Sequence, residues 1–227
     1  MKIGIIADIH SNLRALEAVL KNFKKQRVDK IFCLGDMIGY YHNPIEVINL
    51  LRSIKASCIL GNHEAYLLGY KKCPIKKWRL CFLDLVKEKL TVHQFNWLKE
   101  LPDSLELTIN SKKMAFFHGS PWDHLEGYIY PDFNGFEKFH KLNYNFIFLG
   151  HTHHKMFKVC RNTRIVNPGS CGQPRDKKNK ACAAIFNVDK SEVTFIREPY
   201  DVAKTIKEAK KARVAQEAIF RLEIVNL

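Results

Sequence analysis

The sequence predicts an α/β fold in which two β-rich sheets are flanked by helices. Three observations lead to this prediction. Short apolar runs alternate with helical patterns over residues 1–60, and strand-like runs dominate the second half of the chain. In addition, small polar clusters follow several apolar runs, at the position where each strand would end.

The first part of the chain is typical of strand–helix–strand units. Strand-like runs occupy 3–7, 30–34 and 56–60, and the segments between them have the apolar spacing of helices. Asn12 can cap the first of these helices, and Pro44 lies in the first turn of the second. Units of this length predict a parallel sheet with right-handed crossovers.

Residues 65–100 differ, because their apolar residues keep a helical spacing without a strand-like run. We expect a helical insertion here that forms part of the pocket wall. After it we expect a short helix near 134–141 and, otherwise, mainly strands. The expected strands are 105–109, 113–117, 145–149, 155–160, 163–166, 181–188 and 192–197.

The C-terminal tail, 201–227, has a helical composition, but its apolar stripe changes phase. Val202 and Ile206 share one helix face, whereas Ile219 and Leu222 lie on nearly the opposite face. A kink near 210–213 would explain this drift, and so would a second face used by a partner subunit, as in a homodimer. The whole chain of 227 residues is expected to form a single domain.

The composition limits the setting of the protein. No apolar run reaches the length of about 18 residues that a membrane-spanning helix needs, and the N-terminus lacks the layout of a signal peptide. The seven cysteines are scattered without a Cys-x-x-Cys pair, which argues against disulfides and against a cysteine-based zinc site. We therefore expect no membrane association and a reducing, cytoplasmic localisation.

The formal net charge is +14. Solubility is the simplest explanation, and attraction of an anionic substrate or of nucleic acid is the alternative. No basic stripe with interleaved aromatic residues accompanies the charge, so it supports nucleic acid binding only weakly.

The polar clusters at the predicted strand ends carry the functional prediction. They are Asp8-Ile9-His10, Gly35-Asp36, Gly61-Asn62-His63-Glu64, His118-Gly119 and Gly150-His151-Thr152-His153. Each cluster alone could be an ordinary turn. Together they bring carboxylate, amide and imidazole groups to one sheet edge, and these groups bind borderline divalent metals. Their joint occurrence predicts a two-metal site, and therefore a hydrolase.

Two ions about 3.5–4 Å apart need a bridging carboxylate, and Asp36 at the end of the second strand is the natural bridge. Asp8 and His10 are two positions apart after a strand, so both can reach one ion. His151 and His153 have the same spacing and can reach different ions. A mixture of imidazole and carboxylate favours Mn, Fe, Zn, Co or Ni over Mg or Ca.

These clusters resemble the signature of the calcineurin-like metallophosphoesterases. The segments 167–170 (Asn-Pro-Gly-Ser) and 173–175 (Gln-Pro-Arg) resemble the small prokaryotic phosphodiesterase and phosphatase branch of that superfamily. The resemblance extends from residue 1 to about residue 200. It implies an αββα sandwich of two mixed sheets, with a dinuclear metal site at the strand ends.

The resemblance also implies how the ligands are divided. One ion would be bound by Asp8, His10 and His153. The other would be bound by Asn62, His118 and His151, and Asp36 would bridge the two. Mn²⁺ is the first expectation, and Fe, Zn, Ni or Co are alternatives.

The reaction implied is metal-dependent hydrolysis of a phosphoric ester. The two ions would hold a bridging water as a hydroxide that attacks phosphorus in line. His63, which is not a ligand in this scheme, would lie over the leaving group and stabilise or protonate the departing oxygen, with a structural role as the alternative. Arg175 would clamp a phosphate, with a surface ion pair as the alternative. The expected substrate-binding residues are therefore Arg175, Asn62 and His63.

The substrate itself stays open. A phosphomonoester, a phosphodiester and a nucleotide phosphoanhydride all fit the same site chemistry. A nuclease or RNA phosphatase is a second hypothesis, which the basic charge favours. A metal-binding scaffold without catalysis is the third.

Overall fold

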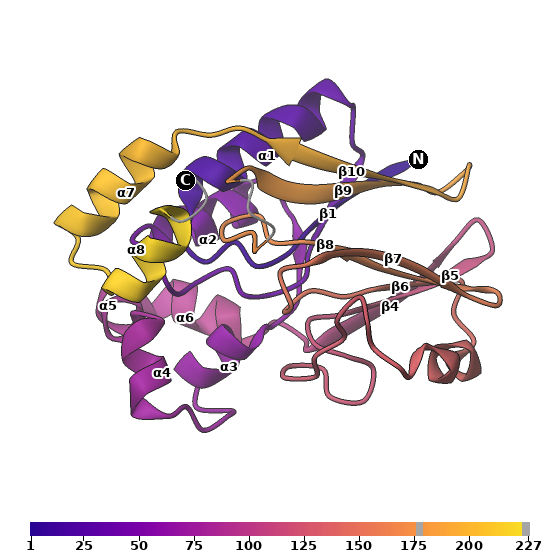
Figure 1. Cartoon of the computed structure of the whole chain (residues 1–227), viewed down its shortest axis with the longest axis horizontal. Coiled ribbons are helices and arrows are strands. Elements are labelled where there is room, and N and C mark those ends of the chain that lie inside the picture. Colours follow the sequence, from indigo (N-terminus) through magenta and orange to yellow (C-terminus); the bar gives the residue numbers. More distant parts are fainter. Residues whose placement is uncertain (176–178, 224–227) are drawn as a thin grey trace.

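The chain forms a sandwich of two five-stranded mixed sheets with helices on the outside (Figure 1). A computed structural model describes residues 1–175 and 179–223 of the protein. The predicted fold class, two mixed sheets flanked by helices, is confirmed.

The first sheet has the strand order β10-β9-β1-β2-β3. Its strands are β1 (Lys2–Ile6), β2 (Lys30–Cys33), β3 (Ser57–Cys58), β9 (Ala181–Asn187) and β10 (Glu192–Glu198). The first three run parallel, and β9 runs antiparallel to both β1 and β10. The parallel pairs follow from the two crossover helices, α1 (Leu13–Lys25) and α2 (Pro44–Ser53).

The second sheet has the strand order β4-β5-β6-β8-β7. Its strands are β4 (Ser104–Ile109), β5 (Lys112–Phe117), β6 (Phe146–Phe148), β7 (Lys155–Cys160) and β8 (Thr163–Pro168). The three central strands are parallel, and the two edge strands are antiparallel to their neighbours. The outer face is covered by η1 (Phe136–Leu142), so the helix expected near 134–141 is a 3₁₀-helix.

Aromatic side chains hold the two sheets together. Phe32 of the first sheet stacks on Phe116 of the second at a ring distance of 4.5 Å, and Phe116 stacks on Phe148 at 5.0 Å. All three side chains are buried in one cluster between the sheets. Stacked aromatic pairs add specific geometry to the burial of apolar area, so the sheets have a fixed relative position.

The remaining helices gather on the other side of the first sheet and beside its end (Figure 1). They are α3 (Asn62–Leu67), α4 (Ile75–Leu80), α5 (Leu83–Lys89), α6 (Val92–Lys99), α7 (Val202–Lys211) and α8 (Gln216–Glu223). Residues 65–100 therefore hold more and shorter helices than the sequence predicts. One reason is Phe82, whose left-handed φ of 57° separates α4 from α5.

A break in the tail explains the change of phase in its apolar stripe. Helix α7 ends at Lys211, and Arg213 has a left-handed φ of 59° before α8 begins. Helix α8 then buries Ile219 and Leu222 in the core cluster on the first sheet. Because α8 buries its stripe within the chain, no partner subunit is needed to explain the pattern, and the homodimer stays a prediction. Residues 224–227 of the tail lie outside the described residues.

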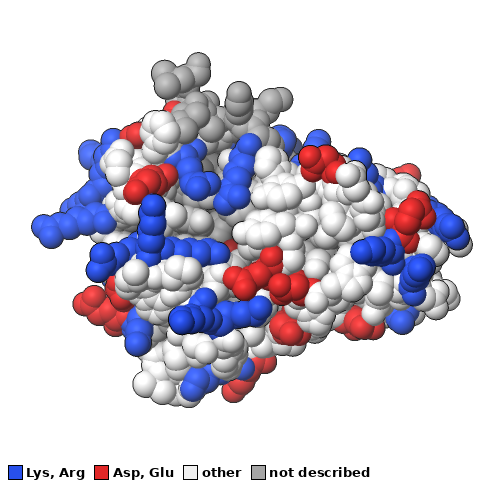
Figure 2. Space-filling view, turned by 60° about the horizontal axis from the view of Figure 1, so that its bottom comes forward, with Lys and Arg blue, Asp and Glu red and all other residues white. Residues whose placement is uncertain are grey.

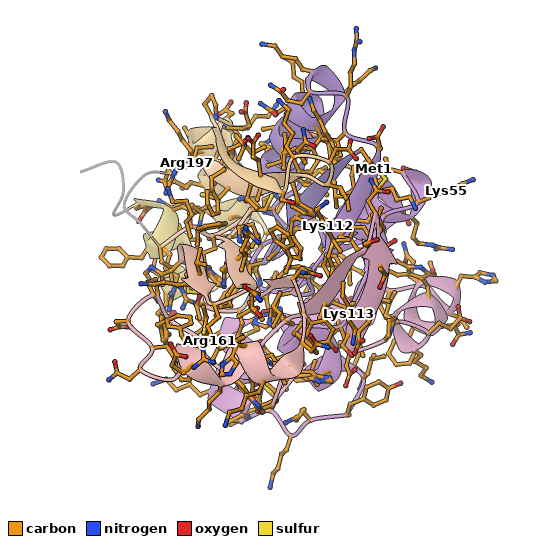
Figure 3. The ribbon with its side chains drawn as sticks, turned by 90° about the vertical axis from the view of Figure 1, so that its right-hand side faces the viewer. Met1, Lys55, Lys112, Lys113, Arg161 and Arg197 are labelled. Atoms are coloured by element: carbon orange, nitrogen blue, oxygen red, sulfur yellow. The ribbon has the colours of Figure 1, made fainter. Side chains whose placement is uncertain are left out.

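The two ends of the sandwich differ in chemistry. Met1, Lys112 and Lys113 lie at the end that faces the viewer in Figure 3, where strands β1 and β5 begin. The carboxyl ends of the parallel strands therefore lie at the opposite end, beside the helices.

In the described parts of the chain, no helix has both the length and the apolar character needed to span a membrane.

Candidate metal centre

Sharp turns follow the carboxyl ends of the central strands and carry the polar clusters. Backbone φ is left-handed at Asp8 (55°), His10 (51°), Asp36 (51°), His151 (64°) and His153 (62°). Such values are uncommon outside glycine, and a group of them marks a strained region of the kind found at functional sites. The turns direct the side chains of Asp8 and His10 toward one group of donors, and those of His151 and His153 toward different groups.

One group of donors joins the first strand to the segment after β6. The Nε2 atoms of His10 and His153 lie 3.0 Å apart, and His153 Nε2 lies 3.6 Å from Asp8 Oδ1. All three side chains are buried, and their ligand atoms lie within 4.8 Å of one another. This geometry can hold one metal ion.

A second group lies beside the first. His118 Nε2 lies 3.1 Å from Asn62 Oδ1 and 3.1 Å from His151 Nδ1. Between the groups stands Asp36, whose Oδ2 is 3.5 Å from His118 Nε2 and 3.8 Å from His10 Nε2. The structure thus brings the seven predicted ligand side chains together, with one carboxylate oxygen facing both groups.

The protonation pattern of the imidazoles fits bound cations. In His10, His118 and His153, Nδ1 faces a backbone carbonyl at 2.7 to 3.3 Å. A carbonyl only accepts, so Nδ1 carries a proton and Nε2 is the ring atom left to bind a cation, by its lone pair in His10 and His153 and after loss of its proton in His118. Lone pairs that face each other at 3.0 Å repel, and a cation between them removes that repulsion. Asp8 Oδ2 is also buried and lacks a hydrogen-bond partner among the described residues.

Burial also shifts the proton affinities of the centre. Burial raises the pKa of Asp8 to about 7. For His118, burial opposes the charged form, but the Asp36 carboxylate outweighs it and raises the pKa to about 9. The carboxylates and imidazoles therefore compete for protons in a space closed to solvent. Divalent cations displace such protons when they bind, so the donor set fits two metal ions.

Asp36 and its turn are held by Glu64. The carboxylate of Glu64 accepts hydrogen bonds at 2.8 to 3.1 Å from four backbone N–H groups, those of Asp36, Met37, Ile38 and Gly61. Separately, the N–H of His63 donates to Asp36 Oδ1 at 2.9 Å, which leaves Oδ2 to face the two donor groups. The anchoring role of Glu64 was not predicted. The available signal was its place three residues after Gly61, at the start of α3.

Comparison with known proteins identifies the family. Residues 1–191 match the family described as the calcineurin-like phosphoesterase superfamily domain. The chain belongs to this superfamily. It is therefore a phosphoric ester hydrolase of the metallophosphoesterase kind, and the predicted resemblance is confirmed.

Similar proteins support the same assignment. The uncharacterized protein MJ0912 of Methanocaldococcus jannaschii is 33% identical, with 94% of each chain covered. A metallophosphoesterase from Sphaerobacter thermophilus has a crystal structure with a TM-score of 0.83 and 30% identity, covering 99% of this chain and 100% of that one. The phosphodiesterase MJ0936 of M. jannaschii is 24% identical over 75% of this chain and 84% of its own.

The Asn-Pro-Gly-Ser turn braces two of the metal-centre turns in this phosphoesterase. Ser170 Oγ donates to the carbonyl of Asp8 at 2.7 Å. Asn167 Nδ2 donates to the carbonyl of Gly150 at 2.6 Å and to Thr152 Oγ1 at 3.1 Å. The segment that carries the family resemblance thus fixes the strained backbone on both sides of the His10–His153 pair.

His63 lies at the edge of the phosphoesterase centre. Its Nε2 is 3.7 Å from Asp36 Oδ2, and with His10 and Asp36 it forms a third group whose ligand atoms lie within 4.8 Å. The ring packs so closely against Gly39 that a Cβ there would lie 2.1 Å from His63 Nδ1. Burial lowers the pKa of His63 to about 4. The ring is therefore fixed in place and neutral.

A shallow depression opens over the centre, and four residues other than the donors and His63 line it: Tyr40, Lys77, Tyr128 and Arg175. Arg175 was predicted to reach the substrate; its Nε is buried and lacks a hydrogen-bond partner within the described chain. The ring of Tyr128 lies 4.0 Å from that of His151. Lys77 was not predicted, because the sequence of α4 shows no motif that places it at the site.

Proposed function

We propose that this protein is a dinuclear metal-dependent phosphoesterase that hydrolyses a small phosphomonoester, phosphodiester or nucleotide phosphoanhydride. The observation that carries the proposal is the position of Asp36 Oδ2, 3.5 Å from His118 and 3.8 Å from His10, between two groups of donors. A carboxylate oxygen shared in this way is what a two-metal site requires.

In this proposal the donors divide between two ions. Asp8, His10 and His153 hold one ion. Asn62, His118 and His151 hold the other, and Asp36 binds both. The mixture of imidazole and carboxylate supports Mn²⁺, with Fe, Zn, Ni or Co as alternatives.

The side chains around the ions have distinct tasks. Bound ions supply an activated water and neutralise charge on the phosphoryl oxygens. Asn62 and His63 lie side by side at the start of α3, so a phosphoryl group over the centre also meets His63. The fixed ring of His63 would stabilise the departing oxygen through a ring N–H, or protonate it once the ring has taken up a proton. Arg175, whose buried Nε has no hydrogen-bond partner among residues 1–175 and 179–223, binds a phosphoryl oxygen.

A pair of chromogenic esters tests the proposal. Protein freed of metal and reloaded with Mn²⁺ is expected to hydrolyse p-nitrophenyl phosphate, its bis ester, or both. A chelator should abolish that activity, and added Mn²⁺ should restore it. If neither ester and no nucleotide phosphoanhydride, such as ATP or diadenosine tetraphosphate, is hydrolysed with Mn²⁺, Fe²⁺, Zn²⁺, Ni²⁺ or Co²⁺, the protein is a metal-binding scaffold and the proposal is wrong.

Metal removal is expected to destabilise the protein. Mn²⁺ at about 100 times its dissociation constant adds about 2.7 kcal/mol to the free energy of unfolding. For a chain of this size that corresponds to a rise of about 5–10 °C in the melting temperature. Differential scanning fluorimetry on chelated and reloaded protein measures the shift. Mg²⁺ serves as the control and should raise the melting temperature less; an unchanged melting temperature with Mn²⁺ would contradict the site.

Replacement of His63 separates its role from those of the ligands. His63→Ala is expected to keep both ions but to lower kcat at least about 100-fold, the usual scale of general acid catalysis. The loss should shrink for an ester with a more acidic leaving group, which needs less protonation. Elemental analysis counts the bound ions, and kinetics measures kcat. His93→Ala, on the exposed side of α6, is the control. Loss of an ion, or full activity, would contradict the assignment.

The net charge of +14 favours a second candidate, a nuclease or RNA phosphatase. On the face shown in Figure 2, basic side chains gather at the two ends of the molecule, with acidic and uncharged side chains between them. Lys112, Lys113 and Arg161 lie at the sandwich end seen in Figure 3. Hydrolysis of oligonucleotides that falls at least about tenfold between 50 and 200 mM salt would support this candidate. Failure to hydrolyse oligonucleotides would exclude the nuclease or RNA phosphatase candidate.

The cysteines support the proposed cytoplasmic setting. All seven are free thiols, and six of them are buried; Cys73 is partly exposed. Unpaired thiols suit a reducing compartment.

A further inference from the structure

Lys77 of helix α4 reaches the metal centre from the helices that follow α3. It lines the same depression as His63 and His151. The neighbouring basic residues of α4, Lys76 and Arg79, line a different pocket, beside α8. Within α4, the charge directed at the centre is therefore that of Lys77.

The side chain of Lys77 is positioned but not neutralised. Its Nζ donates to the hydroxyl of Tyr66 at 2.7 Å and lies 4.7 Å from the centre of the Tyr66 ring. The Tyr66 hydroxyl in turn donates to Glu126, and that carboxylate is paired with Lys71 at 3.3 Å. Lys77 forms no ion pair with a carboxylate of residues 1–175 or 179–223. A half-buried ammonium held by a neutral phenol keeps its charge available for an anion.

Lys77 and Arg175 lie on different sides of the centre. Arg175 follows Gln173, whose backbone carbonyl faces His153 Nδ1 at 2.7 Å. Lys77 is held by Tyr66 of α3, whose ring lies 6.4 Å from that of His63. Arg175 therefore stands on the side of His153, and Lys77 on the side of His63. In the function proposed above, that is the side from which the leaving group departs.

We propose that Lys77 is a specificity-determining residue that binds a negatively charged leaving group. The preferred substrate then carries a second phosphate beyond the scissile bond, as a phosphoanhydride does. Water supplies the new oxygen on the attacked phosphorus, and the bond from that phosphorus to the bridging oxygen breaks. The bridging oxygen keeps the electron pair and leaves as part of a phosphate, whose added charge Lys77 neutralises. This inference rests on the proposed function, which places His63 beside the leaving group.

Steady-state kinetics on Mn²⁺-loaded protein tests the inference with two kinds of substrate. ATP and diadenosine tetraphosphate have phosphate leaving groups, whereas bis(p-nitrophenyl) phosphate does not. Lys77→Met is expected to lower kcat/KM about 10- to 100-fold for the anhydrides and less than about 3-fold for the diester, by the strength of a charge-assisted hydrogen bond. Lys77→Arg should retain most of the anhydride activity, and Lys76→Met, the control on the other side of α4, should change neither activity.

Three results would overturn the inference. An equal loss on both kinds of substrate would show that Lys77 only supports the fold of the site. Unchanged kcat/KM for both kinds of substrate in Lys77→Met would show that Lys77 contacts no leaving group. Hydrolysis of the diester but of neither anhydride by the unmodified protein would exclude the substrate class while leaving the proposed function intact. By contrast, a protein inactive on every substrate would overturn the proposed function itself, and this inference with it.

Discussion

Asp36→Asn is expected to lower kcat/KM by at least about 1,000-fold and to leave the protein with fewer than two bound ions. Asn keeps the shape of the side chain, and its oxygen can still accept the hydrogen bond from the N–H of His63. The other terminal atom of the Asn side chain is then an uncharged amide nitrogen, which can only donate. This nitrogen faces His10 and His118 in place of the carboxylate oxygen Oδ2 of Asp36. Loss of about 4 kcal/mol of transition-state stabilisation corresponds to this fall in rate.

Kinetics and elemental analysis of the same preparation check this result. The control is Asp132→Asn, at an exposed carboxylate outside the depression, which should keep both ions and full activity. An Asp36→Asn variant that holds two ions and hydrolyses substrate at the normal rate would contradict the bridging role.

Glu64→Gln is expected to have the largest effect on stability. Each oxygen of Glu64 accepts two backbone N–H groups, Oε1 from Met37 and Ile38 and Oε2 from Asp36 and Gly61. A glutamine turns an NH₂ group toward one of these pairs, so two buried N–H groups lose their acceptor. At about 1–3 kcal/mol for each unsatisfied group, the free energy of unfolding should fall by about 2–6 kcal/mol.

Urea unfolding in the presence of a chelator measures this loss without a contribution from metal. Glu100→Gln, at an exposed position just after α6, is the matched control and should stay within about 0.5 kcal/mol of the unmodified protein. Metal affinity should fall as well, because the same carboxylate joins the turn of Asp36 to that of Asn62. A Glu64→Gln variant of normal stability would show that the four hydrogen bonds are dispensable.

The parts of the fold that the sequence predicts are those with a strong local signal. A buried strand followed at once by Asp or His, as at Asp8 and Asp36, identifies both an element and the position of its end. Parallel strands then bring such ends together without further information. For this reason the grouping of donors from distant segments could be foreseen, even though β3 shrinks to Ser57–Cys58.

Residues whose role depends on contacts with parts of the chain that are distant in sequence could not be predicted in the same way. Glu64 holds N–H groups that precede it by 26 to 28 positions, and its own neighbourhood shows only a helix start. Lys77 is held beside the centre by the hydroxyl of Tyr66 in α3, a contact that short-range spacing does not reveal. The break at Arg213, which lets α8 return to the core, belongs to the same class. Each depends on tertiary contacts rather than on local periodicity.

A crystal structure of the Mn²⁺-loaded protein, with anomalous scattering used to locate the metal, tests the central claim most directly. The account predicts two anomalous peaks about 3.5–4 Å apart, one among Asp8, His10 and His153, the other among Asn62, His118 and His151, with Asp36 Oδ2 bound to both and His63 to neither. A single peak, or two peaks that do not share Asp36, would contradict the two-metal account.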